Sequence, residues 1–450
     1  MQRRFLGRLT AMWCAAAALG CGNGDDSTVV QGEAGTDVTA SPDAAADVAG
    51  ERGSVVDASE AGADAAEAGE DAGDAALPRR LLLSYNGTTK SELAVFGLES
   101  KAVDGRLVYP GFIGTTYTTA SEPWLLEQAS DVVARLDPRR PWVVGSSWNV
   151  AMSDRADGGA AYSDPVAVVV GAGTKAYVLR YTRNDIAILD TSHTADAGLP
   201  VGSIDLAGQV QASGDGVVEM SAGVYVASKQ IVYVVLANIN KGNVACNGYC
   251  LLCAATHPTV IGIDVAHDTL VDLNGSAPGV ALALTGYDPA FGPGAVAYDA
   301  QADRLLVLHA GCNQAGGDGG VGPLVGREVE ELSLFTGSTR TLLDLTSKGF
   351  PVQLTYVDAH RAILQLDTAY TWDPTVASLG PAIANAPDAF VWDGVGSLLG
   401  VTARYSGDGG LTGYDVVSVR VADGAETKLG TNPFSLTDGF VGGVQLWPAP

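Results

Sequence analysis

Short apolar runs separated by polar turns recur along the chain from about residue 79 to its end. The clearest example is 174–190, TKAYVLRYTRNDIAILD, where strand-like runs at 176–181 and 186–189 flank a polar hairpin at 182–185. The helical period of 3.6 residues is almost absent from this region. Two strands cannot bury both faces of their sheet alone, so a chain that repeats this unit must stack the copies. The pattern therefore predicts an all-β domain over 79–450.

Related runs divide this domain into seven units, near 80–125, 126–163, 164–212, 213–288, 289–350, 351–386 and 387–435. Several units contain three or four strand-like runs, and sheets of about four strands repeated radially are the blades of a β-propeller. In the second unit we interpret 130–137 as the first strand and 141–148 as the second. We predict a seven-bladed β-propeller, with six or eight blades as the alternatives.

The two ends of the domain complement each other. The first unit begins directly with a run typical of a second strand, RLLLSYN at 80–86, and the chain ends with a lone first-type run within 437–448. A terminal strand that completes the first blade would close the ring and remove exposed sheet edges. We therefore expect the C-terminal strand to close the propeller.

The repeat KAYVLRYTRNDIAILDTS resembles the YVTN family of bacterial propeller repeats. Tyr177, Val178, Ile188, Asp190 and Thr191 carry the likeness, which is good in this unit and poor in the others. Members of that family include surface-layer proteins, lactonase-like propellers and amine-dehydrogenase subunits. The resemblance therefore implies architecture more than chemistry.

The N-terminus has the pattern of a targeting segment rather than of folded structure. Three arginines within the first eight residues precede an apolar run at 9–19, which is too short to cross a bilayer as a stable helix. The run ends in Ala-Leu-Gly-Cys at 18–21, which resembles a bacterial lipobox. The resemblance implies a signal peptide over 1–20, cleavage before Cys21 and acylation of that cysteine. The alternative is an ordinary secretory signal followed by an incidental cysteine.

An acylated Cys21 would attach the protein to a lipid bilayer. Gly22 after the cysteine, in place of aspartate, favours the outer membrane by analogy. We therefore expect a lipoprotein of the bacterial cell envelope, in the outer membrane, that faces the periplasm or the cell surface.

The segment that follows, 21–78, is rich in alanine, aspartate and glycine. Between residues 22 and 78 it contains fourteen acids and one base, which is about half of the net charge of −25. Low hydrophobicity and charge of one sign predict a disordered, extended tether, with a short alanine-rich helix as the alternative. The absence of a basic patch argues against nucleic acid as a partner, because phosphate binding requires lysine and arginine.

Four cysteines of the domain are candidates for disulfides. Cys246, Cys250 and Cys253 form a cluster, and Cys312 occupies the matching place in the next unit. Cysteines of an exported protein pair as disulfides, whereas the spacing of the cluster also resembles a metal-binding motif. We expect one bridge to link Cys312 to the cluster at 246–253, and a structural metal is the alternative.

Few residues are candidates for a ligand site. Arg180 and His309 end the second strands of their units, positions that can face the mouth of a central channel. The glycines of VAVVVGAGTKA at 166–176 imitate a dinucleotide fingerprint, but a strand follows them where that fingerprint needs a helix. We expect no cofactor, no resident metal and no catalytic set.

These observations favour a monomeric, non-enzymatic propeller on a lipid anchor and an acidic tether. Its rim loops would bind a protein, a peptide or a glycan of the envelope or the extracellular space. The alternative is a lactonase-like hydrolase or a dehydrogenase-type propeller with a site at the channel mouth.

Overall fold

The computed structural model describes residues 77–449, apart from 112–114, 120–121, 152–162, 193–197, 213, 241–243, 246–249, 254–255, 274, 276–278 and 317–320. The expectations for the signal peptide, Cys21 and nearly all of the acidic linker lie outside the described residues. The described secondary structure is almost all strand, with two short 3-10 turns, η2 (Gln128–Ser130) and η3 (Ala207–Gln209). No helix in these ranges is long and apolar enough to span a lipid bilayer. The predicted all-β class is confirmed.

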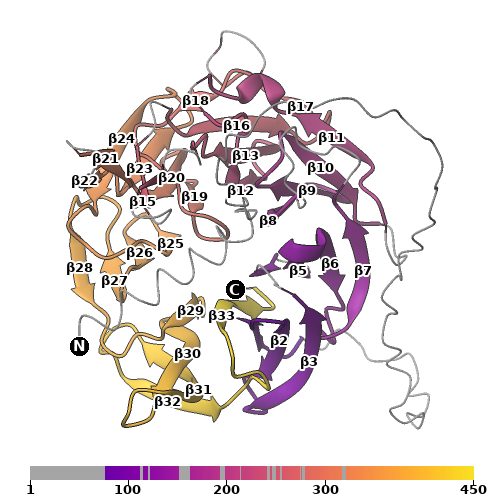
Figure 1. The fold of residues 1–450 in the computed structure, drawn as a ribbon, viewed down its shortest axis with the longest axis vertical. Helices are drawn as coiled ribbons and strands as arrows, with labels where there is room; N and C mark the ends of the chain where they lie inside the picture. The colour runs from indigo at the N-terminus through magenta and orange to yellow at the C-terminus, as the bar shows by residue number, and fades with distance from the viewer. Residues whose placement is uncertain are drawn as a thin grey trace, which may run out of the picture. The chain divides into compact units, whose positions relative to one another are not determined.

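The strands of the described ranges form seven antiparallel blades arranged in a ring, together with two additional two-stranded sheets (Figure 1). From the ring axis outward, blade 1 contains β33 (Phe440–Trp447), β1 (Arg80–Asn86), β2 (Lys90–Gly97) and β3 (Ala102–Pro110). Blade 2 contains β4 (Thr115–Thr118), β5 (Pro123–Glu127), β6 (Val132–Leu136) and β7 (Val144–Asn149). Blade 3 contains β8 (Pro165–Val170), β9 (Lys175–Arg180), β10 (Asp185–Asp190) and β11 (Gly202–Asp205).

Blade 4 contains β12 (Met220–Val226), β13 (Ile231–Leu236), β16 (Thr259–Asp264) and β17 (Thr269–Leu270), and β18 (Leu282–Ala283) also pairs with β16. Blade 5 contains β19 (Val296–Asp299), β20 (Arg304–His309), β23 (Glu328–Ser333) and β24 (Thr339–Asp344). Blade 6 contains β25 (Gln353–Asp358), β26 (Arg361–Gln365), β27 (Ala369–Trp372) and β28 (Leu379–Ala382). Blade 7 contains β29 (Ala389–Trp392), β30 (Ser397–Tyr405), β31 (Leu411–Arg420) and β32 (Glu426–Thr431). The predicted number of blades is confirmed.

One assignment within the ring was wrong. The run at 130–137 is not a first strand, because β6 is the third strand of blade 2 and the run at 141–148 supplies the outer strand β7. The first strand is β4, a short polar segment with the sequence TTYT. Such a segment carries no apolar run, so hydrophobic periodicity alone does not reveal it.

The alternation of side chains along each strand explains how the ring is held together. On β1, Leu81, Leu83 and Tyr85 pack against blade 7, whereas Leu82 packs against Leu125 and other residues of blade 2. Successive residues of a strand point to opposite faces of the sheet, so each inner strand contacts both neighbouring blades. The described core accordingly divides into seven apolar clusters, one between each pair of adjacent blades.

The C-terminal strand closes this ring. β33 pairs antiparallel with β1, from Arg80 opposite Trp447 to Asn86 opposite Phe440. The Trp447 side chain is buried, and its Nε1 donates a hydrogen bond to the Pro138 carbonyl of blade 2 at 2.8 Å. The first blade is therefore built from both ends of the domain, as the complementary ends predicted.

Candidate functional site

Two additional hairpins extend from one rim of the propeller. The pair β14 (Val244–Ala245) and β15 (Cys250–Leu251) lies between the second and third strands of blade 4. The pair β21 (Cys312–Ala315) and β22 (Val321–Val325) occupies the same place in blade 5. Because the strands of a blade alternate in direction, these connections share a rim with the segments that enter the first strand of each blade. The hairpins therefore lie beside the segment 284–295 that leads into β19.

The two hairpins are joined covalently and by their backbones. Cys253 and Cys312 form a disulfide with a Cα–Cα distance of 5.0 Å. The Cys253 N–H donates to the Asn313 carbonyl at 2.8 Å, and Leu252 forms a parallel β-bridge with Asn313. The prediction that Cys312 is linked to the cysteine cluster is confirmed.

The other two cysteines of the cluster are only partly covered by the structure. Cys246 lies outside the described residues, and the Cys250 side chain is not described. Within the described part of the chain, no three His, Cys, Asp or Glu side chains come together as a metal site.

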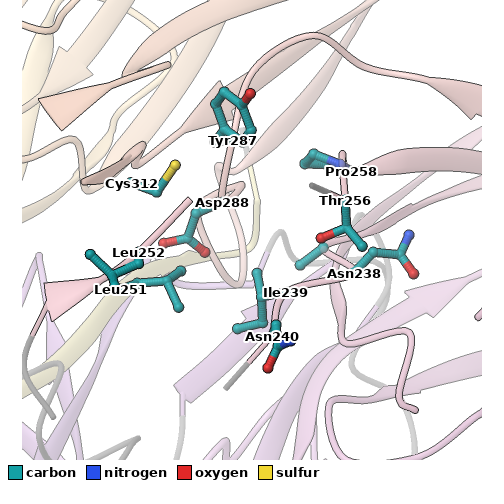
Figure 2. A pocket seen from close by; sticks show the side chains of 11 residues that line it. Asn238, Ile239, Asn240, Leu251, Leu252, Thr256, Pro258, Tyr287, Asp288 and Cys312 are labelled. Carbon is teal, nitrogen blue, oxygen red and sulfur yellow. The ribbon is translucent and has the colours of Figure 1, made fainter. Parts of the chain in front are cut away.

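A small pocket lies where these hairpins meet the body of blades 4 and 5 (Figure 2). Its cavity volume is about 10 Å³, which is room for about one water molecule. Its lining comes from the end of β13, the segment before β16, the segment before β19 and the start of β21, and comprises Ala237, Asn238, Ile239, Asn240, Leu251, Leu252, Thr256, Pro258, Tyr287, Asp288 and Cys312.

Among the described residues that line the pocket, Asp288 and the phenol of Tyr287 are the only ionisable side chains. The Asp288 residue is 4% exposed, and its Oδ1 has no hydrogen-bond partner. Burial raises the pKa of the Asp288 carboxyl to about 8, since the charged form loses its hydration without a compensating donor. In Figure 2 the Asp288 carboxyl group and the Thr256 hydroxyl group both point into the pocket.

The backbone explains why an aspartate occupies this position. Asp288 has a positive φ of 47°, a left-handed conformation that aspartate tolerates better than most residues. Its carbonyl accepts a hydrogen bond from the Ala310 N–H at 2.7 Å, which continues the pairing beyond the end of β20. This turn sets the direction in which the side chain leaves the backbone.

The same turn recurs in the two preceding blades. Asp164 (φ 53°) and Glu219 (φ 43°) also precede a first strand, and their carbonyls accept from the N–H groups of Tyr181 and Ala237. The Glu219 carboxylate, however, accepts a hydrogen bond from the Ile239 N–H at 2.9 Å. In blade 5 the equivalent residue is Cys312, which begins β21 and pairs with Val325. The pairing of Cys312 within its hairpin thus accompanies the loss of the donor that a carboxylate has in blade 4.

Two further polar atoms at the pocket lack partners. Thr256 and Asn238 are almost fully buried, and neither the Thr256 Oγ1 nor the Asn238 Oδ1 has a hydrogen-bond partner. The Asn238 Nδ2 donates to the Thr259 Oγ1 at 3.1 Å, which orients the amide. Buried polar groups without partners are uncommon in proteins, and each one requires an explanation.

Arg180 and His309 do not face an open channel mouth. Both residues are 0% exposed. The Arg180 guanidinium pairs with Asp185 and donates to the Val150 carbonyl at 3.0 Å, so it braces blade 3 against blade 2. Contacts with Asp185 and Glu330 on the third strands hold both side chains inside the protein.

His309 contacts a carboxylate that holds the segment leading to Asp288. Its Nε2 lies 3.0 Å from the Glu330 Oε2, and this carboxylate accepts hydrogen bonds from the backbone N–H groups of Thr285 and Gly286. Burial acts to raise the pKa of Glu330, but the contacts with His309 and Gly286 outweigh it and hold that pKa well below its usual range. A Cβ at Gly286 would lie 2.6 Å from the His309 ring, so only glycine permits this approach. The pair therefore positions the segment that carries Asp288.

Sequence reasoning did not find Asp288, although a signal was present. Asp-Pro precedes the first strand in both blade 3 (164–165) and blade 5 (288–289). Aligning these two dipeptides would have placed an acid at the same rim position in each blade. Burial of Asp288 without a partner follows only from the adjoining hairpins, which periodicity does not reveal.

Comparisons with known proteins show no family for this chain. No family model and no curated protein matches the chain. A structure that carries the name 6-phosphogluconolactonase, from Bacteroides uniformis, is 10% identical, with 82% of this chain and 99% of that chain covered and a TM-score of 0.43. The structure of apo AztD from Citrobacter koseri is 11% identical, with 82% of this chain and 98% of that chain covered and a TM-score of 0.42. A functionally unknown protein from Desulfotomaculum acetoxidans is 7% identical, with 81% of this chain and 98% of that chain covered and a TM-score of 0.46.

Proposed function

We propose that this protein is a binding module of the bacterial cell envelope, held at the membrane by an acylated Cys21 and an acidic tether. The partner is a protein or peptide that contacts the rim carrying the two additional hairpins. One observation supports this choice of rim above others: the disulfide between Cys253 and Cys312 joins two hairpins that extend beyond the blades. A rigid, covalently fixed rim lowers the entropic cost of binding.

The location of the partner surface is tested by site-specific photo-crosslinking in intact cells. A photoreactive amino acid replaces Val321 of β22, which is 40% exposed. The matched control places it at Phe335, which is 88% exposed and lies between β23 and β24, and hence on the opposite rim. We expect a discrete adduct from position 321 and none from 335. Adducts from 335 alone, or the same pattern from both positions, would contradict the proposal.

The membrane anchor is tested separately. Labelled palmitate should be incorporated into the full-length protein, and Cys21→Ser should abolish the labelling and move the protein from the membrane fraction to the soluble fraction. Labelling that survives this substitution would show that Cys21 is not the acylated residue. Cys21→Ser leaves the propeller unchanged. The crosslinking pattern of this variant can therefore be compared with that of the native protein in reconstituted membranes.

A further inference from the structure

A second pocket, the seam pocket, lies where blades 7 and 1 meet. Its lining comes from Tyr85 near the end of β1, from 411–414 at the start of β31 and from 432–437 in the segment that leads into β33. These are ends of second strands, starts of third strands and entries to first strands, so the pocket shares a rim with the two additional hairpins. Its cavity volume is about 180 Å³. A protein cavity of roughly 150 Å³ is large enough to bind benzene.

Three aromatic rings form much of the wall of the seam pocket. The ring centroids of Tyr85 and Phe434 lie 4.8 Å apart. Tyr414 meets the Tyr85 ring edge-on at 6.0 Å and the Phe434 ring edge-on at 5.5 Å. Leu411 and Leu436 add aliphatic surface to this wall. Aromatic rings attract one another in edge-on and offset arrangements, so this wall suits a further ring.

Several polar groups of the pocket already have partners within the protein. The Thr412 Oγ1 donates to the Arg404 carbonyl at 3.2 Å, and the Arg404 guanidinium donates to the Asn432 Oδ1. The Tyr85 hydroxyl accepts a hydrogen bond from the Gly439 N–H at 2.7 Å. Among the described residues that line the pocket, the tyrosine phenols are the only ionisable groups. The lining therefore favours a neutral apolar occupant over a sugar, whose hydroxyl groups would lose their hydration without full replacement.

Buried hydrogen bonds hold the wall of the pocket in place. Glu92 is 0% exposed, and its Oε2 accepts from the N–H groups of Ser435 at 2.8 Å and Leu436 at 3.2 Å. The Oε1 of the same carboxylate lies 2.8 Å from the Arg106 Nε. The segment that carries Phe434 is therefore fixed before a ligand arrives, which lowers the entropic cost of binding.

We infer that the seam pocket binds the aromatic ring of a phenylalanine side chain of the partner, against Tyr85, Tyr414 and Phe434. The inference rests on the proposed function for the identity of the partner, and it specifies which kind of side chain the rim recognises. An aromatic side chain that fills a preformed pocket is a common anchor of protein interfaces.

The experiment uses N-acetyl-phenylalanine amide as the probe, with N-acetyl-leucine amide as the aliphatic comparison and methyl glucoside as the sugar comparison. The full-length protein carries Cys21→Ser, which keeps lipid out of the assay. Ligand-observed NMR titration should show that the phenylalanine amide binds roughly 2- to 10-fold more tightly than the leucine amide, the ratio expected for added aromatic contacts. Methyl glucoside should not compete.

Phe434→Leu removes one ring of the wall and keeps an apolar side chain, so it should abolish the preference for the phenylalanine amide. Phe335→Leu is the matched control, because Phe335 is 88% exposed, does not line the pocket and should leave the preference unchanged. Leu411→Ala changes a lining residue that is 36% exposed, and it serves as the second variant if Phe434→Leu does not fold. It should weaken the binding of both amides several-fold.

Equal binding of the two amides, binding of neither, or a preference that survives Phe434→Leu would overturn the inference. Tighter binding of methyl glucoside would overturn it in favour of a glycan. A discrete adduct from position 321 alongside any of these results would leave the proposed function standing. Binding of the phenylalanine amide as expected, without an adduct from position 321, would support the pocket and contradict only the proposed function.

Discussion

At the scale of single residues, the same backbone turn recurs on the rim of blades 3 to 5, but the hydrogen bonding of its acidic side chain differs between blades. Asp164, Glu219 and Asp288 share a left-handed backbone conformation before the first strand of their blades. Glu219 obtains a backbone donor from Ile239, and Asp288 does not. The turn is the same in both blades, whereas the residue equivalent to Ile239 in blade 5 is Cys312, which pairs with Val325. A carboxylate that has a backbone donor in one blade thus lacks it in the next.

The raised pKa of Asp288 predicts how stability changes with pH. In the unfolded chain an aspartate titrates near its ordinary value, about 3.9, and in the folded protein Asp288 titrates at about 8. Between these values the folded state binds more protons than the unfolded state, so the free energy of unfolding falls as pH rises. The contribution of this group stops changing above the folded pKa. Asp288→Asn should remove this decline and stabilise the protein by about 2–5 kcal/mol in mildly alkaline buffer.

Urea unfolding at about pH 5 and about pH 9 measures this effect. The difference between the two pH values should be smaller in Asp288→Asn than in the native protein. Asp164→Asn provides the comparison, since it changes an acid in the same turn outside the pocket. Parallel pH profiles for native protein and Asp288→Asn would contradict the prediction.

At the scale of elements, side-chain contacts join neighbouring blades to one another. The tyrosine of the YVTN-like repeat, Tyr177, is buried, and its hydroxyl donates to the Asp268 carboxylate of blade 4 at 2.6 Å. Lys175 pairs with the same carboxylate at 2.7 Å. These residues therefore join blade 3 to blade 4, which is a structural role. The tyrosine that resembles the repeat of that family therefore contributes to the assembly of the ring.

Removing the disulfide should loosen the hairpin rim. The bridge between Cys253 and Cys312 closes a loop with a sequence separation of 59. Loop-closure entropy then predicts that the double substitution Cys253→Ser and Cys312→Ser destabilises the protein by about 4 kcal/mol. Thermal unfolding measures the loss, and hydrogen exchange should increase first at 244–253 and 312–325.

Reduction of the native protein supplies the control for this prediction. Treatment with a thiol reductant should lower the melting temperature of the native protein towards that of the double variant and leave the variant unchanged. A double variant that melts at the native temperature would show that the backbone hydrogen bond from Cys253 to Asn313 and the neighbouring β-bridge suffice to hold the hairpins together.

At the scale of the whole domain, stability depends on closing the ring. Seven apolar clusters lie between the blades, and the cluster between blades 1 and 2 includes Trp447 of the C-terminal strand. If β33 were absent, β1 would present an unpaired edge, which favours aggregation. Closure therefore both buries apolar surface and removes that edge.

Trp447→Ala tests the contribution of this strand. Loss of a buried tryptophan and of its hydrogen bond to Pro138 should destabilise the protein by about 3–5 kcal/mol. Phe335→Ala is the control, because its ring is 88% exposed and its loss should change stability by no more than about 0.5 kcal/mol. Chemical denaturation compares the two variants. Equal effects would show that the terminal strand does not hold the ring closed.

The amino-acid sequence by itself determined the class of fold, the number of blades and the way in which the ring closes. These properties depend on local patterns, namely apolar runs of strand length, polar turns and two ends with complementary strands. The same patterns placed Cys312 beside the cysteine cluster, because matching positions in adjacent blades share a rim. The short polar strand β4 escaped this reasoning because it contains no apolar run.

Only the tertiary structure decided which polar side chains are buried and which of them have partners. Arg180 and His309 have the sequence positions of channel residues, yet both are buried and contact acids on the third strands. Asp288 has the sequence position of an ordinary turn residue, yet hairpins from two blades bury it without a donor. Burial and hydrogen bonding depend on residues brought together from distant parts of the chain, and a local pattern carries no information about them.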